Sequence, residues 1–225
     1  MKRILLIGLV CCLCFTAQAQ LQKGTKYLGG TVSFNGTTSE SHLVNQKSDS
    51  QGSNQHTIIP ELQFGYFVNS TTMIGLGLQY NLLWYNTRSS LPEVKNTSVL
   101  QSWQLSPFIR KYKTFGNRWA VFLHGEVGPS YQLDKYKIKG DNPYESKGDY
   151  WKYRLSVKPG IVYTFPKKTW AVEAYANVLS LDFTYLPVTS GTSSARQIIL
   201  TSGLSTSFPT YFTLRIAKYI PSKAN

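Results

Sequence analysis

Cysteine is almost absent from this sequence, and its position decides what the absence excludes. The chain of 225 residues has 3 cysteines, and all of them lie near the N-terminus, at Cys11, Cys12 and Cys14. From Gln20 onward there is none. This part of the chain therefore cannot form a disulfide framework or a cysteine metal site. If it is exported, it must be stabilised by sheet closure and by packing.

Long hydrophobic runs are missing too. The one apolar run, Ile4 to Phe15, follows the basic Met1-Lys2-Arg3 and precedes Ala17-Gln18-Ala19. It is too short to span a bilayer as a helix, and its flanks are those of a signal peptide cleaved after small residues. The alternatives are a retained helical anchor and a lipoprotein signal, although none of the cysteines follows the small residue that a lipobox requires. We predict a signal peptide over 1–19 and one domain over 20–225, without transmembrane helices.

Acidic residues are scarce. The chain has 24 Lys and Arg residues against 11 Asp and Glu, and removing Lys2 and Arg3 with the signal peptide leaves 22 basic residues. These are scattered over turns, loops and one strand face, without the clustered stripe that binds nucleic acid. The charge favours attraction to anionic lipid headgroups or to lipopolysaccharide phosphates instead.

What the sequence does have is strict alternation of apolar and polar residues. Between residues 74 and 84, every second residue is apolar or aromatic: Ile74, Leu76, Leu78, Tyr80, Leu82 and Trp84. Successive side chains of a strand point to opposite faces, so such a segment has one apolar side. Ten to fourteen residues at about 3.3 Å each cross the roughly 30 Å of a bilayer at the tilt of a barrel strand. The pattern predicts membrane-spanning strands.

The alternation predicts eight strands with short and long connections in turn. The strands are expected at 25–36, 56–68, 72–86, 97–112, 118–132, 150–165, 169–184 and 197–220. The short links are 69–71, 114–117 and 166–168, and the long polar loops are 37–55, 87–96, 133–149 and 185–196. This order is typical of outer-membrane barrels whose two termini lie on the periplasmic side. The predicted fold is an all-β, eight-stranded, antiparallel, up-and-down transmembrane β-barrel.

Four prolines recur at spacings of about fifty residues, namely Pro60, Pro107, Pro159 and Pro209. They suggest a unit of loop, strand, turn and strand that is used about four times. Proline removes a donor from a strand ladder and is normally kept out of central strands. We therefore expect a bulge or bend at this recurring position.

Aromatic residues gather near the predicted strand ends, as the girdles of a membrane barrel require. On the turn side we place Tyr66, Tyr112, Phe115, Trp119, Tyr163, Phe165, Trp170 and Tyr219. On the loop side we place Trp84, Tyr85, Trp103, Tyr131, Trp151, Tyr153, Phe183 and Tyr185. Ordinary sheet packing is the alternative, because aromatic residues favour strands in any case.

Several segments are similar to those of a known family. They are Gly24 to Gly30, the stretch from Pro60 to Gly65-Tyr66-Phe67-Val68, Pro107-Phe108-Ile109-Arg110, and Pro159 to Tyr163. The whole mature chain resembles the small outer-membrane β-barrel proteins of the Bacteroidetes type, in the wider family that includes the OmpA transmembrane domain and OmpX. The resemblance implies a Gram-negative outer membrane and insertion by the barrel-assembly machinery. One departure is the tail after Tyr219-Ile220, which displaces the terminal aromatic residue that this machinery reads.

The strand faces opposite to the apolar ones carry charge. The inward-facing charged residues, with one histidine, are Glu61, Arg110, His124, Glu126, Arg154, Lys158, Glu173 and Arg215. Eight-stranded barrels are narrow enough for side chains to fill them, and each unpaired buried ion would cost several kcal/mol. We expect these residues to form a salt-bridge network that plugs the lumen, in a structural or surface-interaction protein whose four long loops meet external partners.

Two other functions stay open. One is a narrow polar path for protons, ions or small solutes, which requires water in the lumen. The other is a lipid-modifying enzyme, which needs a nucleophile, a base and an orienting acid. His124 and Glu126 share a face, and Ser102, Ser106 and Ser130 are candidates to approach them, as is Ser156. A lone inward histidine is more often part of a polar network, so we expect no catalysis. No cofactor motif or metal-ligand spacing is present in the sequence.

Overall fold

The computed structural model describes residues 21–42, 50–90, 93–166, 169–190, 193–202 and 212–222. The predicted signal peptide lies outside these ranges. The elements are β1 (Lys26–His42), β2 (Ser50–Asn69), β3 (Thr72–Ser90), β4 (Glu93–Phe115), β5 (Trp119–Lys139), β6 (Tyr144–Thr164), β7 (Trp170–Ala176), the 3-10 turn η1 (Asn177–Leu179), β8 (Leu181–Ser190), β9 (Ser193–Ser202) and β10 (Phe212–Ile220). None of the helical turns described is long and apolar enough to cross a membrane.

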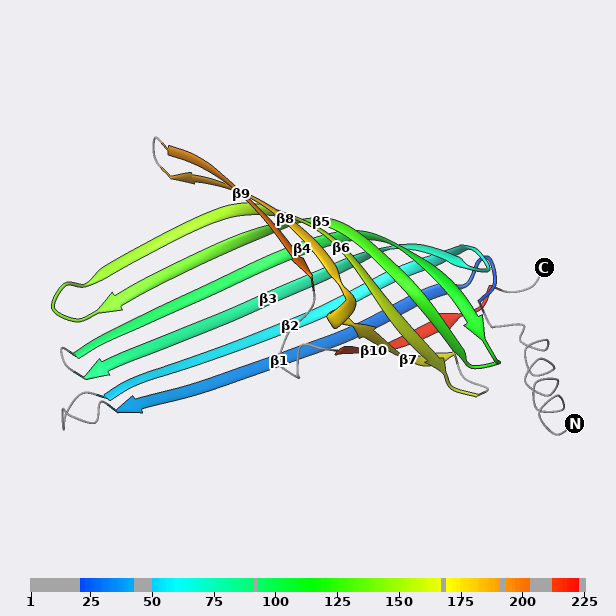
Figure 1. Ribbon diagram of the computed structural model, residues 1–225, viewed down its shortest axis with the longest axis horizontal. Coiled ribbons are helices and arrows are strands. Elements are labelled where there is room, and N and C mark those ends of the chain that lie inside the picture. The colour runs from blue at the N-terminus through cyan, green and yellow to red at the C-terminus, as the bar shows by residue number, and fades with distance from the viewer. Residues whose placement is uncertain are drawn as a thin grey trace, which may run out of the picture.

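Eight of the strands form a closed antiparallel ring. Each of β1 to β6 is hydrogen-bonded to the next, β6 pairs with β7, β7 with β10, and β10 with β1. The start of β1 and the end of β10 therefore lie side by side at one end of the molecule (Figure 1). The prediction of an all-β antiparallel fold in which eight strands close on themselves is confirmed to this extent.

The alternation of the sequence follows the wall of the ring. Along β5, exposed and buried residues alternate from Trp119, with Val121 and Leu123 outside and Phe122 and His124 inside. Paired residues of neighbouring strands share a face, so the outward side chains form an outer apolar band around the ring. Its members include Leu28, Val32, Phe34, Leu62, Phe64, Ile74, Leu76, Leu78, Leu105, Ile109, Val121, Leu123, Val127, Leu155, Trp170, Leu214 and Ile216.

The buried core lies inside the ring, toward the end where the short turns are. It consists mainly of aromatic residues, among them Tyr27, Phe67, Phe108, Tyr112, Phe122, Tyr175 and Tyr219. Two of these rings lie against the inner face of the neighbouring strand at a glycine, because a Cβ atom at Gly75 would overlap the Phe108 ring and one at Gly160 would overlap the Phe122 ring.

The short turns agree with the prediction where the structure describes them. Between β2 and β3, Asn69 Oδ1 accepts hydrogen bonds from the backbone nitrogen of Thr71 at 2.9 Å and from its hydroxyl at 3.1 Å. Between β4 and β5 the chain reverses at Gly116, whose φ of 66° suits a residue without a side chain. The third link is described only in part, since residues 167–168 lie outside the described ranges.

The four long loops were predicted wrongly, because most of their residues are strand. β1 and β2 stay paired as far as His42 and Ser50, and β3 and β4 as far as Ser90 and Glu93. The segments 133–149 and 185–196 likewise fall largely in the β5–β6 and β8–β9 hairpins. Alternation of apolar and polar residues depends on the surroundings of the side chains. Strand pairing depends on backbone hydrogen bonds, which form equally well where both faces of the strands are polar. The pattern therefore marked the outer apolar band, not the ends of the strands.

The last two predicted strands are also corrected. The segment 169–184 is divided into β7, η1 and β8, and 197–220 is divided into β9 and β10, with 203–211 outside the described residues. On β6, Gly160 faces Tyr175 of β7 while Val157 faces Leu181 of β8, so the second strand contains three additional residues, those of η1. The β8–β9 hairpin leaves the ring at this point (Figure 1).

The expected proline bulge is not formed at the described positions. The β2–β3 ladder is interrupted beside Pro60 and the β4–β5 ladder beside Pro107, but the register is the same on both sides of each interruption. Pro159 is paired with Leu123 in the ordinary register. Proline therefore removes donors here without inserting a residue. Pro209 lies outside the described residues.

Candidate functional site: a polar network inside the ring

Arg110 lies at the centre of the ring interior and is completely buried. Its Nη1 donates to Glu173 Oε2 at 3.0 Å and to the Tyr112 hydroxyl at 3.3 Å. Its Nη2 donates to the Gln63 side chain and to the Tyr175 hydroxyl. Because Arg110 has one anionic partner and several neutral ones, its charge is balanced by Glu173.

Aromatic rings surround this guanidinium group. Its Cζ lies 4.8 Å from the ring centroid of Tyr27, 5.1 Å from those of Phe108 and Phe122, and 5.3 Å from that of Tyr175. Such contacts attract a cation and exclude water at the same time. Arg110 and the aromatic side chains around it therefore block the interior of the strand ring at this level.

Glu173 is the matching anion and is also completely buried. Besides Arg110, it accepts hydrogen bonds from the Tyr27 hydroxyl at 2.8 Å and from the Tyr219 hydroxyl at 2.6 Å. Its oxygens thus have donors on several sides, which is the condition for keeping a carboxylate away from water.

His124 connects this buried pair to the next one. Its Nδ1 accepts a hydrogen bond from Arg110 Nε at 2.9 Å, so its proton lies on Nε2, which faces Glu126 Oε2 at 3.1 Å. The other oxygen of Glu126 pairs with Lys158 Nζ at 2.9 Å. With both ring nitrogens used in this way, His124 has none left to deprotonate a serine hydroxyl.

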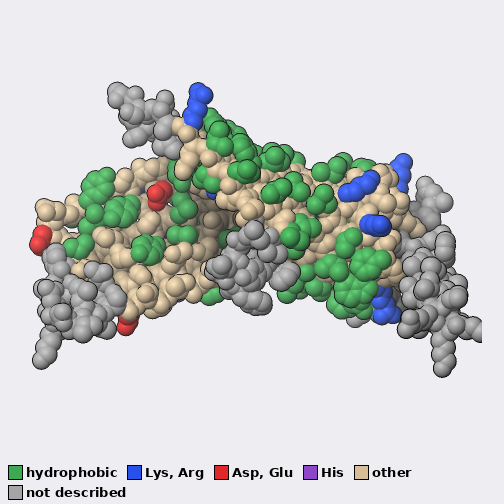
Figure 2. Space-filling model, in the orientation of Figure 1, with side chains coloured by type: hydrophobic (Ala, Val, Ile, Leu, Met, Phe, Trp, Pro, Cys, Tyr) green, Lys and Arg blue, Asp and Glu red, His purple; other side chains and the backbone are tan. Residues whose placement is uncertain are grey.

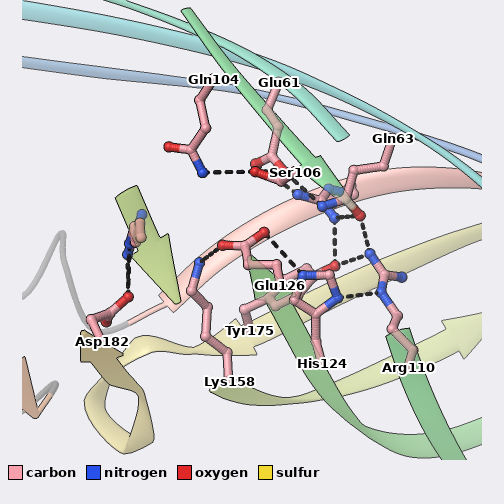
Figure 3. Close-up of polar contacts among 12 residues, drawn as sticks. Glu61, Gln63, Gln104, Ser106, Arg110, His124, Glu126, Lys158, Tyr175 and Asp182 are labelled. Carbon is pink, nitrogen blue, oxygen red and sulfur yellow. Dashed lines mark hydrogen bonds and ion pairs between the residues drawn. The ribbon is translucent and has the colours of Figure 1, made fainter. Parts of the chain in front are cut away.

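Two further ion pairs complete the network (Figure 3). Arg215 Nη2 lies 2.8 Å from Glu61 Oε2, and Arg215 also donates to Gln63 and Tyr175, which are partners of Arg110 as well. On the other side of the interior, Arg154 pairs with Asp182 of β8. All eight residues predicted for the lumen network thus face the interior, and each takes part in an ion pair or a hydrogen bond.

Sequence reasoning missed Asp182, and the cause is local. In an unbroken strand Asp182 would face the opposite way from Glu173, since their numbers differ in parity. The three residues of η1 reverse that parity, so Asp182 faces inward and Phe183 outward. No alternation pattern contains this information.

The predicted positions of Tyr112 and Tyr219 were wrong for a different reason. Both were assigned to the outer girdle, yet both are buried in the interior, where their hydroxyls lie 3.4 Å apart. Tyr112 shares the parity of Arg110, and Tyr219 shares that of Arg215, so parity predicts the right face. The assignment by residue type and by closeness to a strand end was wrong.

On the side of the Arg110–Glu173 pair that faces away from the short turns, the interior holds a polar cavity of about 240 Å³. The other three ion pairs, Arg215–Glu61, Lys158–Glu126 and Arg154–Asp182, all line it. Their side chains are more exposed than the central pair, up to 28% for Arg154. The interior is therefore filled by side chains near the short turns and contains a cavity on the side toward the long hairpins. Within the described residues, no cluster of histidine and acidic side chains suits a metal ion.

Beyond the outer apolar band, the β5–β6 hairpin carries an exposed charge cluster that is separate from the network. Glu145 lies 3.2 Å from Lys147 Nζ and 3.4 Å from Lys137 Nζ. These two ammonium groups, of which that of Lys147 has the larger effect, hold the pKa of the Glu145 carboxyl below its ordinary value. The cluster provides a matched control for the buried pairs.

No protein-family model matches the chain, and no curated protein matches it in sequence. Among solved structures, it is similar to the crystal structure of the Pseudomonas putida toluene transporter TodX, with 8% sequence identity and a TM-score of 0.30. The match covers 90% of this chain and 68% of that one.

Proposed function

We propose that this chain is an integral outer-membrane β-barrel protein whose lumen is plugged by its own side chains, with a structural or surface-interaction role. In this proposal it belongs with the small Bacteroidetes-type barrels, reaches the outer membrane behind a signal peptide, and is inserted by the barrel-assembly machinery. Outer-membrane lipid and lipopolysaccharide contact its outer surface.

The outer apolar band is the observation that supports a membrane location. On the face drawn in Figure 2, hydrophobic side chains gather mainly over the half of the molecule that carries the short turns, and most of the visible Lys and Arg lie toward that end. Members of the band such as Leu62, Ile109 and Leu123 are about half exposed. A soluble monomer rarely exposes a continuous patch of this extent, whereas hydrocarbon would cover it without cost.

The buried Arg110–Glu173 pair supports a plugged lumen over the narrow-pore alternative. The cavity of about 240 Å³ lies on one side of this pair, and the core around Phe67, Phe122 and Tyr219 lies on the other. A continuous water path would have to separate two completely buried charges. The surface-interaction role falls to the hairpin ends of β1–β2, β3–β4, β5–β6 and β8–β9, which replace the predicted loops.

The contacts of His124 argue against the third function, a lipid-modifying enzyme. A serine nucleophile needs a free base nitrogen within hydrogen-bond reach, and both nitrogens of this ring are engaged by Arg110 and Glu126. Replacing His124 with Ala is expected to leave the lipid A composition of the host membrane unchanged.

Planar-bilayer recording of the purified mature protein tests the plug. We expect no discrete openings from the wild type, because the pair is held by several hydrogen bonds that must break together. Regular, ion-selective openings would contradict the plug and favour the pore. A mature protein that stays monomeric in aqueous buffer without detergent would contradict the membrane location itself.

A further inference from the structure

The short-turn end of the ring carries positive charge only. Its exposed or partly exposed basic residues, which we call the turn-end cations, are Lys23, Lys26, Lys111, Lys113, Arg118 and Lys218. All of the 11 acidic residues except Asp49 are described, and none of those described lies at this end. Four face the interior, and the others, on the long hairpins, are Glu40, Glu93, Asp134, Asp141, Glu145 and Asp149. On the face drawn in Figure 2, the visible Asp and Glu accordingly lie toward the hairpins.

The contacts of the turn-end cations are with neutral groups. Lys111 Nζ donates to the Thr72 hydroxyl at 2.9 Å, and Arg118 Nη1 donates to the Tyr163 hydroxyl at 3.4 Å. The ammonium group keeps two further donors and the guanidinium group four. Within the described ranges, no ion pair links a turn-end cation to a carboxylate. By contrast, the two lysines of the exposed charge cluster on the β5–β6 hairpin share one carboxylate.

The turn-end cations border the outer apolar band. Lys111 follows Ile109 by two residues on the outward face of β4, and Lys218 follows Ile216 in the same way on β10. Lys218 is paired with Trp170 of β7, and its Nζ lies 5.4 Å from the centroid of the Trp170 ring. Belts of aromatic residues mark the headgroup region of a bilayer. The cations therefore lie where lipid headgroups would surround the ring.

The cations are densest around the β4–β5 turn. Lys111 and Lys113 are both exposed and share the outward face of β4, about 7 Å apart along the strand. Arg118 directly precedes β5 on the other side of the turn. Like charges at this separation repel each other, and a phosphate between them would accept charge-assisted hydrogen bonds from both. Each Lys or Arg near an anionic membrane surface corresponds to about a fivefold preference for that surface.

The place of this end in the membrane indicates the kind of lipid. The start of β1 and the end of β10 lie at the short-turn end (Figure 1), and in an outer-membrane barrel this end faces the periplasm. Lipopolysaccharide occupies the opposite leaflet, so the lipids here are phospholipids. A zwitterionic headgroup balances its own phosphate with an ammonium group, whereas an anionic headgroup brings a net negative charge to cations that have no carboxylate partner.

We propose that the turn-end cations bind the headgroup phosphates of anionic phospholipids, of the phosphatidylglycerol kind, in the periplasmic leaflet. Lys111, Lys113 and Arg118 form the main site, and the aromatic residues beside the cations hold the same level of the bilayer. The inference rests on the proposed membrane location. It goes beyond general lipid contact, because it assigns one class of lipid to one end of the ring.

The tryptophans of the full mature protein allow each end to be tested separately in vesicles. Replacing Trp84, Trp103 and Trp151 with Phe leaves Trp119 and Trp170 as reporters of the short-turn end, and the reciprocal variant reports the hairpin end. The probes are phosphatidylglycerol and phosphatidylethanolamine, each brominated near the headgroup and mixed with phosphatidylcholine. From fluorescence quenching we expect at least a fivefold preference for phosphatidylglycerol at the short-turn end, and a smaller one at the hairpin end. Equal preference for the two lipids at the short-turn end, or equal preferences at the two ends, would overturn the site.

Two double variants with the same change of charge locate the site. Lys111→Gln with Lys113→Gln should lower the preference at the short-turn end at least threefold, whereas Lys135→Gln with Lys139→Gln, on the outward face of β5 near its hairpin, should not. Folding is checked by heat-dependent migration on gels.

Equal losses from the two double variants, or an unchanged preference in a folded Lys111→Gln/Lys113→Gln protein, would overturn the site. Added lipid A that displaces the brominated phosphatidylglycerol more effectively than phosphatidylglycerol itself does would overturn the choice of phospholipid. Tryptophans that no brominated lipid quenches would overturn the membrane location instead.

Discussion

Replacing Glu173 with Gln is the sharpest test of the plugged interior. The substitution keeps the shape of the side chain but removes the one carboxylate in contact with Arg110, whose other partners, Gln63, Tyr112, Tyr175 and His124, are neutral. Arginine cannot lose its proton in a protein, so a completely buried cation would be left without an anion. Breaking a buried pair in this way costs about 3–5 kcal/mol.

The free energy of unfolding can be measured for the protein in lipid vesicles by guanidinium titration, with the fluorescence of its 5 tryptophans as the signal. We expect Glu173→Gln to lower it by about 3–5 kcal/mol. Asp182→Asn, in a partly exposed pair, should lower it by about 1 kcal/mol or less. Glu145→Gln, in the exposed cluster outside the ring, should leave it unchanged within error.

A double variant separates the ion pair from the loss of packing. Arg110→Met together with Glu173→Gln removes both charges, so its cost should be smaller than the sum of the two single costs by roughly 2 kcal/mol. If Glu173→Gln stays within about 1 kcal/mol of the wild type, or if the two single costs simply add, Arg110 is hydrated in the native protein. The plug would then be refuted.

Three further predictions use the same unfolding assay. Gly75→Ala should destabilise the protein by about 1–3 kcal/mol, since the new methyl group overlaps a buried ring and a backbone oxygen; Gly125→Ala, whose methyl group would lie 3.7 Å from its neighbour, should be neutral, and equal effects would contradict the packing. Leu76→Arg in the outer apolar band should cost about 2–4 kcal/mol in a bilayer, but Tyr144→Arg at the β5–β6 hairpin should cost little; equal costs would argue against hydrocarbon around the band. Asn69→Ala should cost about 0.5–1.5 kcal/mol by removing two turn hydrogen bonds, and no change would show that the turn needs no side-chain acceptor.

The inward and outward faces of most strands could be predicted from alternation, because the period of a strand depends only on its backbone. Glu61, Arg110 and Arg215 were placed inside on this basis alone, and they lie inside. Tyr112 was misplaced when residue type was preferred to parity. The lesson is specific to narrow rings, whose interior accepts aromatic rings as readily as the outer surface does.

The partners of the inward charges could not be predicted, since pairing depends on which strands meet across the ring. Lys158 was expected in the network, but its pairing with Glu126 of the neighbouring strand follows from the β5–β6 register. The choice of Asp182 as the partner of Arg154 required η1 to reverse the parity of the strand. Local periodicity carries no record of such insertions.

By itself, the sequence determined that the chain forms long antiparallel strands with one apolar and one polar face, because alternation is a local property of each segment. Only the tertiary structure decided that β7 and β10 close the ring between β6 and β1, and that β8 and β9 leave it. It also decided that four ion pairs fill or line the interior. These features depend on registers between strands distant in sequence. Such registers follow from the packing of the whole ring, so they cannot be read from the sequence of any single segment.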